Sequence, residues 1–206
     1  WDINQEDLFD ISIRTGVLEE SLLNHLKTDL KKINVLKAVF DKKFVRRLSG
    51  DWVKTGKNKM DLAKQVEIDI QNFNKMNNIK SNIMIWCGST EIFLEPSEVH
   101  SSLSKFEEGL INNHPKISPS MIYAYSALKM GIPFANGSPN LSVDIPALEQ
   151  LAMNKQTPIC GKDFKTGQTL MKTIIAPGLK ARQIGINGWF STNILGNRDG
   201  EVLDDP

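Results

Sequence analysis

A chain of 206 residues is long enough for one large domain, or for one domain and part of a second. Hydrophobic residues make up 40% of the chain and charged residues 24%, which is enough to build a core in an ordinary globular protein. The formal net charge of +1 argues against a nucleic-acid partner, and no apolar run approaches the roughly 20 residues that cross a membrane.

The two cysteines, Cys87 and Cys160, lie far apart, and the three histidines are scattered. This spacing predicts no metal site, and it is typical of a protein in the reducing cytoplasm. The chain begins with Trp1 and not with methionine, and its first residues have no signal-peptide pattern. We therefore expect an internal piece of a longer, cytoplasmic protein.

In chain order, residues 6–30 predict helix, and residues 34–57 are irregular and basic. From about Lys59 onward, segments with helical spacing of apolar residues, such as Leu62, Val66, Ile70 and Phe73, alternate with short apolar runs. Further helices are expected at 58–76, 97–112, 118–131, after a cap at Asp144, and at 166–178, and strands at 83–86, 132–135, 157–160 and 182–190.

Strands separated by helices predict an α/β fold, a Rossmann-like and mainly parallel sheet with helices on both faces. The unbroken apolar run at 83–86 is expected to be a central buried strand. In such sheets ligands bind beyond the carboxyl ends of the strands. The candidate binding loops are therefore the segments after residues 86, 135, 160 and 190.

The first two of these loops, residues 87–91 and 136–140, consist mainly of small and polar residues. Glycine and small hydroxyl side chains let a ligand approach the backbone closely. The same residues also form ordinary strand-to-helix loops and turns, so ligand contact and a plain turn both remain open.

The third loop, residues 161–169, leads from a strand into a helix start, where free backbone N–H groups favour an anion such as phosphate. Thr166, Gln168 and Thr169 add side-chain donors, Lys165 adds charge, and Gly167 allows close approach. A capped surface helix is the alternative. The fourth loop, residues 191–200, holds a polar cluster that is either a site or a solvated turn.

Several of these segments, in this order, resemble the myo-inositol-1-phosphate synthases. That family carries Trp-Asp-Ile, Trp-Thr-Ala-Asn-Thr-Glu, Asn-Gly-Ser-Pro, Gly-Asp-Asp-x-Lys-Ser-Gly-Gln-Thr and Tyr-Asn-x-Leu-Gly-Asn-x-Asp-Gly. The corresponding segments here are residues 1–3, 86–91, 136–139, 161–169 and 192–200, and residues 118–120 resemble a helix start of the family. This chain departs from the family pattern at Cys87-Gly88-Ser89, Lys162, Thr166, Thr192 and Arg198.

The resemblance implies an isomerase that converts D-glucose 6-phosphate to 1L-myo-inositol 1-phosphate for inositol and phospholipid biosynthesis. NAD serves as cofactor through oxidation, enolisation, intramolecular aldol cyclisation and reduction, in a cytoplasmic homotetramer. The family's glycine-rich loop would lie upstream and its essential lysines downstream, so the isolated chain is expected to be inactive. Residues 1–180 would be part of the NAD-binding domain, and residues 181–206 would begin a second, α+β catalytic and oligomerisation domain.

The resemblance also implies roles for individual residues. The implied catalytic residues are Asp163, Lys165, Asn193 and Asp199. The residues implied to bind the substrate phosphate are Thr166, Gly167, Gln168 and Thr169. The implied cofactor contacts are Asp2, Ala38, Val39, Ser49, Gly50, Cys87, Gly88, Ser89, Thr90, Gly137, Ser138, Asp163, Thr166, Asn197, Arg198 and Asp199. No metal is implied.

Two other functions remain open from the residues alone. A dehydrogenase of a phosphorylated aldehyde or semialdehyde, dependent on NAD(P), would use a nucleophilic cysteine with a histidine nearby. The chain could also be a non-catalytic binding or oligomerisation fragment.

Overall fold

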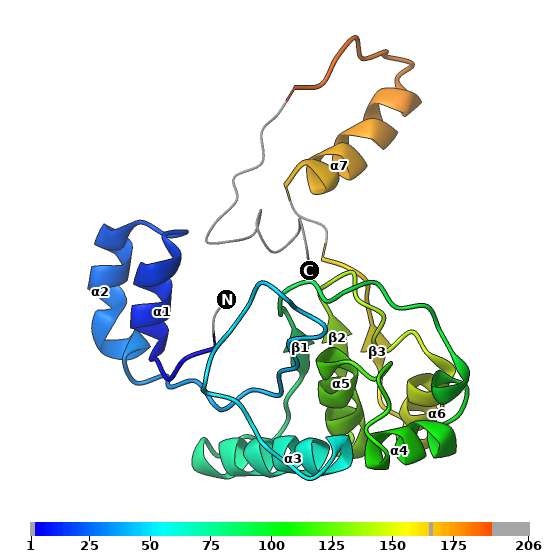
Figure 1. Ribbon diagram of the computed structural model, residues 1–206. Helices are drawn as coiled ribbons and strands as arrows, with labels where there is room; N and C mark the ends of the chain where they lie inside the picture. Colours follow the sequence, from blue (N-terminus) through cyan, green and yellow to red (C-terminus); the bar gives the residue numbers. More distant parts are fainter. Residues whose placement is uncertain (1–2, 165–166, 191–206) are drawn as a thin grey trace.

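Three short parallel strands form the sheet in the computed structural model, which describes residues 3–164 and 167–190 (Figure 1). The strands are β1 (Met84–Trp86), β2 (Phe134–Asn136) and β3 (Ile159–Cys160), and they lie in the order β1-β2-β3. Ile85 pairs with Ala135, and Phe134 pairs with Ile159. The predicted parallel α/β sheet is therefore confirmed.

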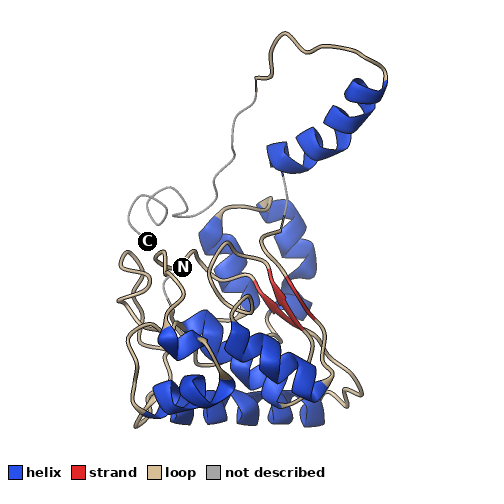
Figure 2. Cartoon of the chain, turned by 90° about the vertical axis from the view of Figure 1, so that its right-hand side faces the viewer, coloured by secondary structure: helices blue, strands red, loops and turns tan. Residues whose placement is uncertain are grey.

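Helices precede and separate these strands. They are α1 (Leu8–Thr15), α2 (Glu20–Leu30), α3 (Lys59–Met76), the 3-10 helix η1 (Glu98–His100), α4 (Leu103–Ile111), α5 (Pro119–Lys129), α6 (Pro146–Lys155) and α7 (Gly167–Ala181). In both views α7 projects away from the other helices (Figures 1 and 2). None of the described helices is both long enough and apolar enough to cross a membrane.

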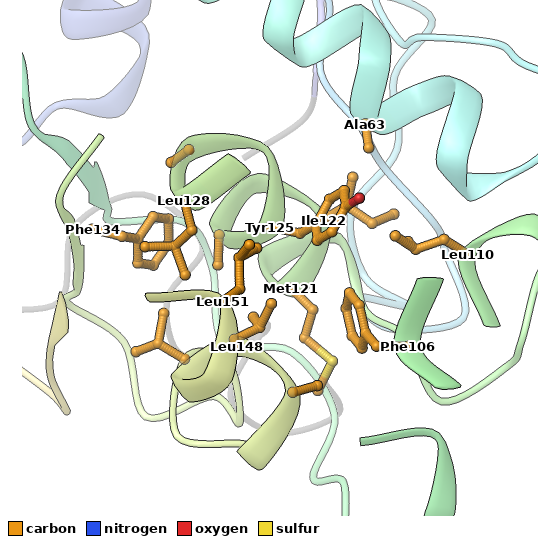
Figure 3. Packing of buried hydrophobic residues seen from close by; sticks show 14 of the residues in the cluster. Ala63, Phe106, Leu110, Met121, Ile122, Tyr125, Leu128, Phe134, Leu148 and Leu151 are labelled. Carbon is orange, nitrogen blue, oxygen red and sulfur yellow. The ribbon is translucent and has the colours of Figure 1, made fainter. Parts of the chain in front are cut away.

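Helix α5 is at the centre of the hydrophobic core. It begins as predicted, because the Ser118 side chain accepts a hydrogen bond from the Met121 N–H at 3.4 Å and Pro119 occupies the first turn. Each large apolar side chain that it buries contributes about 1.5–3 kcal/mol to folding. Figure 3 shows Met121, Ile122, Tyr125 and Leu128 of α5 among Ala63, Phe106, Leu110, Phe134, Leu148 and Leu151.

Three predicted helices differ in their bounds from the observed ones. The segment 6–30 is two helices, because Gly16 ends α1 in the left-handed region with φ of 62°. The segment 97–112 is also interrupted, since Ser102 caps α4 after η1 has ended. Asp144 does not cap α6, whose N-cap is Ile145. Its carboxylate instead pairs with the Lys162 ammonium at 2.6 Å.

The predicted apolar stripe of α3 is only partly buried. Asn58 caps the helix by accepting from the Asp61 N–H at 2.9 Å, and Val66 and Ile70 lie in the core. Phe73 is 52% exposed. The stripe therefore reaches the core at its N-terminal and middle turns only.

The prediction of a central buried strand at 83–86 is wrong for the described sheet. β1 lies at one end of the strand order, and Ile83 and Ile85 are 66% and 55% exposed. Met84 and Trp86, which alternate with them along the strand, pack against the core. An apolar run predicts a strand, but it does not show which face of that strand is covered by neighbouring elements.

The predicted strand at 182–190 is also wrong. Residues 184–190 have no helix or strand, and Ile184, Ile186 and Phe190 are 49%, 53% and 97% exposed. A strand requires a hydrogen-bonded neighbour, and the described sheet ends at β3. No strand among the described residues pairs with this apolar segment.

Candidate functional site

A cavity of about 370 Å³ lies at the carboxyl end of β1. The turn after β1 forms one wall with Cys87, Gly88 and Ser89, and the loop before α3 contributes Ala38 and Val39. We call this cavity the β1 pocket. Its other lining residues are Ile3, Val45, Leu48, Trp86, Glu91, Pro119 and Tyr123. Five residues predicted to contact a cofactor are thus brought together from two separate segments.

Backbone hydrogen bonds fix the Ala38–Val39 wall of the pocket. Ala38 donates its N–H to the Trp52 carbonyl at 3.1 Å, and its own carbonyl accepts from Lys54 at 2.7 Å. The Val39 N–H donates to the Tyr123 hydroxyl of α5 at 3.0 Å. Burial raises the pKa of this tyrosine. The irregular segment before α3 is therefore tied directly to the core helix.

Ser49 and Gly50 contribute to the pocket through Ile3. The Ile3 N–H donates to the Ser49 carbonyl at 2.7 Å, and Ile3 pairs with Gly50 in a parallel bridge. The φ of Gly50 is 145°, and a Cβ there would collide with the Ile3 backbone. These two residues, predicted to contact a cofactor, hold the Ile3 wall of the pocket.

Gly88 lies directly against the indole of Trp86. A Cβ at position 88 would lie 2.6 Å and 2.9 Å from two carbons of that ring. The Trp86 ring packs in turn on Tyr123, with 5.4 Å between the ring centroids. The indole nitrogen of Trp86 is buried and has no hydrogen-bond partner among the described residues.

The loop after β2 lies beside this turn. Gly137 donates its N–H to the Trp86 carbonyl at 2.9 Å, and a Cβ on Gly137 would lie 2.8 Å from that oxygen and from the Phe164 ring. The Ser138 backbone N–H and hydroxyl both donate to the Asn136 side-chain oxygen at 3.1 Å. Ser138 is 5% exposed, so its side chain points into the protein.

Thr90, the last residue of the predicted turn, lines a neighbouring cavity of about 520 Å³. That cavity also contains Asn140 and the ion pair between Lys162 and Asp144. The pKa of the Asp144 carboxyl is lowered, because the Lys162 ammonium and the Ser142 N–H outweigh the effect of its burial. Thr90 therefore faces a different space from Cys87, Gly88 and Ser89.

The described part of the loop predicted to bind phosphate is not packed against the core. Gly167, Gln168 and Thr169 form the first turn of α7, a helix with no buried residue. A Cβ added at Gly167 would meet nothing within 4 Å. Asp163 is half-buried before that helix, and Lys165 and Thr166 lie outside the described residues. The described residues of this loop do not line the β1 pocket.

The family model described as myo-inositol-1-phosphate synthase, which covers an NAD-binding domain, matches residues 1–198. The chain belongs to this family. The other predicted members of the site, Asp2, Asn193, Asn197, Arg198 and Asp199, lie outside the described residues.

Individual relatives agree with the family. The inositol-3-phosphate synthase 1 of Bacteroides thetaiotaomicron is 45% identical over 207 residues, covering 100% of this chain and 48% of the relative. The inositol-3-phosphate synthase of Saccharomyces cerevisiae is 32% identical, covering 100% of this chain and 41% of its own length. The chain therefore spans less than half the length of these two relatives.

A solved structure matches the fold as well. The inositol-3-phosphate synthase of Caenorhabditis elegans superimposes with a TM-score of 0.79 at 26% identity. The match covers 89% of this chain and 36% of that structure. The parallel sheet and its helices are thus those of an inositol-3-phosphate synthase.

The sequence did not predict several residues that form the β1 pocket. Tyr123 and Glu91 bind the walls together, and Trp86 lies beneath the turn. Glu91 and Trp86 are within the segment 86–91 that resembles the family, so the motif marked the segment but not their contacts. Tyr123 had no local signal, because its contact with Val39 spans 84 residues of sequence.

The cysteine-dependent alternative finds no support in this geometry. Cys87 is exposed at the β1 pocket, but none of the residues lining that pocket is a histidine. Cys160 is exposed at the end of β3. No group of three potential metal ligands was found among residues 3–164 and 167–190.

Proposed function

We propose that the protein containing this chain is an NAD-dependent inositol-3-phosphate synthase that converts D-glucose 6-phosphate to 1L-myo-inositol 1-phosphate. The observation that carries the proposal is the β1 pocket, where residues matching the family's dinucleotide contacts come from separate segments. We further propose a cytoplasmic homotetramer that acts in inositol and phospholipid biosynthesis. Residues 1–180 would belong to the NAD-binding domain and residues 181–206 to the start of the catalytic domain.

The residues of the β1 pocket fit part of a dinucleotide. Gly88 leaves the exposed turn without a side chain, so a ligand can contact its backbone directly. Ile3, Val39 and Leu48 provide apolar walls, and Trp86, whose buried indole N–H has no partner among the described residues, also lines the pocket. Apolar walls with a few polar groups are typical of cofactor sites.

NAD, when bound, would accept a hydride from the sugar phosphate and later return it, so that it would not be consumed. In this proposal, the pocket residues orient the dinucleotide and exclude water from it. Thr166, Gly167, Gln168 and Thr169 hold the substrate phosphate, and Lys165 adds positive charge beside it. Asp163, Asn193 and Asp199 are the proposed polar groups around the reacting carbons.

The test uses the full-length protein with Gln168→Ala. Loss of one charge-assisted hydrogen bond to the phosphate is worth about 1.5–3 kcal/mol. The KM for glucose 6-phosphate should therefore rise by about tenfold or more, while NAD binding should change much less. Gln71→Ala, on the exposed face of α3, is the matched control.

Two results would contradict the proposal. A full-length protein that binds NAD but makes no inositol phosphate from glucose 6-phosphate would refute the activity. Equal losses for both ligands in Gln168→Ala, or no loss for the sugar phosphate, would refute the phosphate site. The isolated 206-residue chain should be inactive, and turnover by it would show that it is not a partial enzyme.

A further inference from the structure

Glu91 is a buried carboxylate at the wall of the β1 pocket. The residue is 5% exposed and follows the turn that carries Cys87, Gly88 and Ser89. One carboxylate oxygen accepts from the Ser120 N–H at 2.9 Å, and the other accepts from the Ser120 hydroxyl at 2.6 Å. Ser120 lies in the first turn of α5, where a negative charge is favoured by the helix dipole.

A second set of hydrogen bonds joins Glu91 to the loop after β2. Its backbone N–H donates to the Asn140 side-chain oxygen at 2.9 Å. The Asn140 carbonyl accepts from the Asn136 side chain at 2.9 Å, and Asn136 in turn accepts twice from Ser138. Glu91 is thus connected through buried groups to the Gly137-Ser138 turn.

The turn is anchored at both of its ends. Cys87 and Gly88 are exposed, and Gly88 has no side chain. One end of the turn is held by the Trp86 carbonyl, which accepts from Gly137. The other end is held by Glu91. Both anchors therefore contribute to the position of the turn.

Burial and the nearby negative charge of Asp41 disfavour the ionised form of Glu91. Burial raises the pKa of the Glu91 carboxyl, and the negative charge of Asp41 raises it further, while the bonds from Ser118 and Ser120 oppose the shift. Lys59 is the nearby cation, and the charge of Glu91 acts to raise its pKa. A buried carboxyl of this kind costs stability, and such groups are concentrated at functional sites.

We propose that Glu91 is a positioning residue for the cofactor site. It holds the Cys87–Ser89 turn against α5 and against the loop after β2, which keeps the two predicted dinucleotide-binding turns at a fixed separation. This inference rests on the proposed function, because it concerns how the same pocket binds NAD. It assigns Glu91 no contact with substrate.

The experiment measures NAD affinity by fluorescence titration of the full-length protein and its Glu91→Ala, Glu91→Gln and Ser120→Ala variants. Glu91→Ala should weaken NAD binding by about tenfold, or about 1.4 kcal/mol, with a change of less than about twofold in the KM for glucose 6-phosphate. Glu91→Gln keeps the shape of the side chain and should recover most of the loss. Glu95→Gln, four residues away and exposed, is the control and should bind like the wild type.

If Glu91→Ala does not fold, Glu91→Gln and Ser120→Ala decide the question. Each should weaken NAD binding by about threefold, and the double variant should be no weaker than the worse single variant, because both act on one pair. The inference is overturned if the folded variants bind NAD like the wild type, or if NAD and glucose 6-phosphate are lost equally. A wild-type protein that binds no NAD would instead overturn the proposed function.

Discussion

Replacing Gly88 by alanine would place a methyl group where the Trp86 ring now lies. The new Cβ would be 2.6 Å from the nearest ring carbon, roughly 1 Å short of the separation of about 3.5 Å at which two carbons are in contact. The ring cannot move away freely, because it packs on Tyr123, whose hydroxyl holds the Val39 backbone. The strain should therefore reach both walls of the β1 pocket.

The expected size of the effect follows from this overlap. Overpacking a well-packed region costs about 1–3 kcal/mol of stability. A displacement of about 1 Å at a ligand site can cost up to about a hundredfold, so a loss of about ten- to a hundredfold in NAD affinity is expected for Gly88→Ala. The KM for glucose 6-phosphate should change less, since its proposed site begins at α7.

The assay is a fluorescence titration with NAD, combined with thermal unfolding of the same samples. Gly185→Ala is the matched control, because a Cβ there would meet nothing within 4 Å and its φ is not in the left-handed region. If Gly88→Ala binds NAD as tightly as the Gly185→Ala protein does, the turn does not approach the dinucleotide and the assignment of the β1 pocket fails.

Three further predictions concern the core and its buried polar groups. Phe134→Ala should lower the free energy of unfolding by about 3–5 kcal/mol in denaturant titrations, since Phe134 is 1% exposed, and a loss below about 1 kcal/mol would contradict its place in the core. Tyr125→Phe removes a 2.7 Å bond to Glu107 and should cost about 1–3 kcal/mol. Burial and this bond raise the pKa of Tyr125 to about 12, so an ordinary tyrosinate titration would refute the contact. Because the pKa of Glu91 is raised in the folded state, its favourable contribution is complete below its ordinary value of 4.5 and is lost as the pH rises through the raised value. The stability of wild type relative to Glu91→Gln should therefore fall above pH 4.5, and a constant difference would show that Glu91 is not buried.

The parts of the fold that the sequence predicted well depend on local signals. Ser118 and Pro119 specify the start of α5, and Asn58 specifies the start of α3, because caps act within one helical turn. Short apolar runs between helices likewise identified β1, β2 and β3, each within two residues of its observed bounds. These features need no knowledge of distant parts of the chain.

The errors concern features that depend on distant neighbours. Ile85 is exposed because it points to the face of β1 opposite Met84 and Trp86, which pack against the core, and no local pattern encodes which face is covered. The segment 182–190 has strand-like composition but lacks a pairing partner in the described residues. Asp144 is of a residue type that often caps helices, yet its carboxylate forms an ion pair with Lys162 instead. In each case the presence or absence of a tertiary contact decided the outcome against the local propensity.

The same distinction applies to the site. The resemblance to the family identified the Cys87–Ser89 turn together with Ala38 and Val39, and the structure brings these two segments to one pocket. It could not identify Tyr123 or the bond between Glu91 and Ser120, because both contacts join segments 29 or more residues apart. Composition marks where a loop is unusual, but the partner of a buried polar group is known only from the fold.

The motif residues around the β1 pocket differ in the groups that they contact. A Cβ at Gly88 would meet the Trp86 ring, whereas at Gly50 and Gly137 another backbone approaches within 3 Å of the place where a Cβ would lie. Ser138 donates both its polar groups to Asn136 and so holds its own loop. Replacing Gly137 or Ser138 would first disturb the contacts with Trp86 and Asn136. Any effect on ligand binding would follow from the loss of these contacts. A loss of NAD binding in such variants would not by itself assign these residues as cofactor contacts.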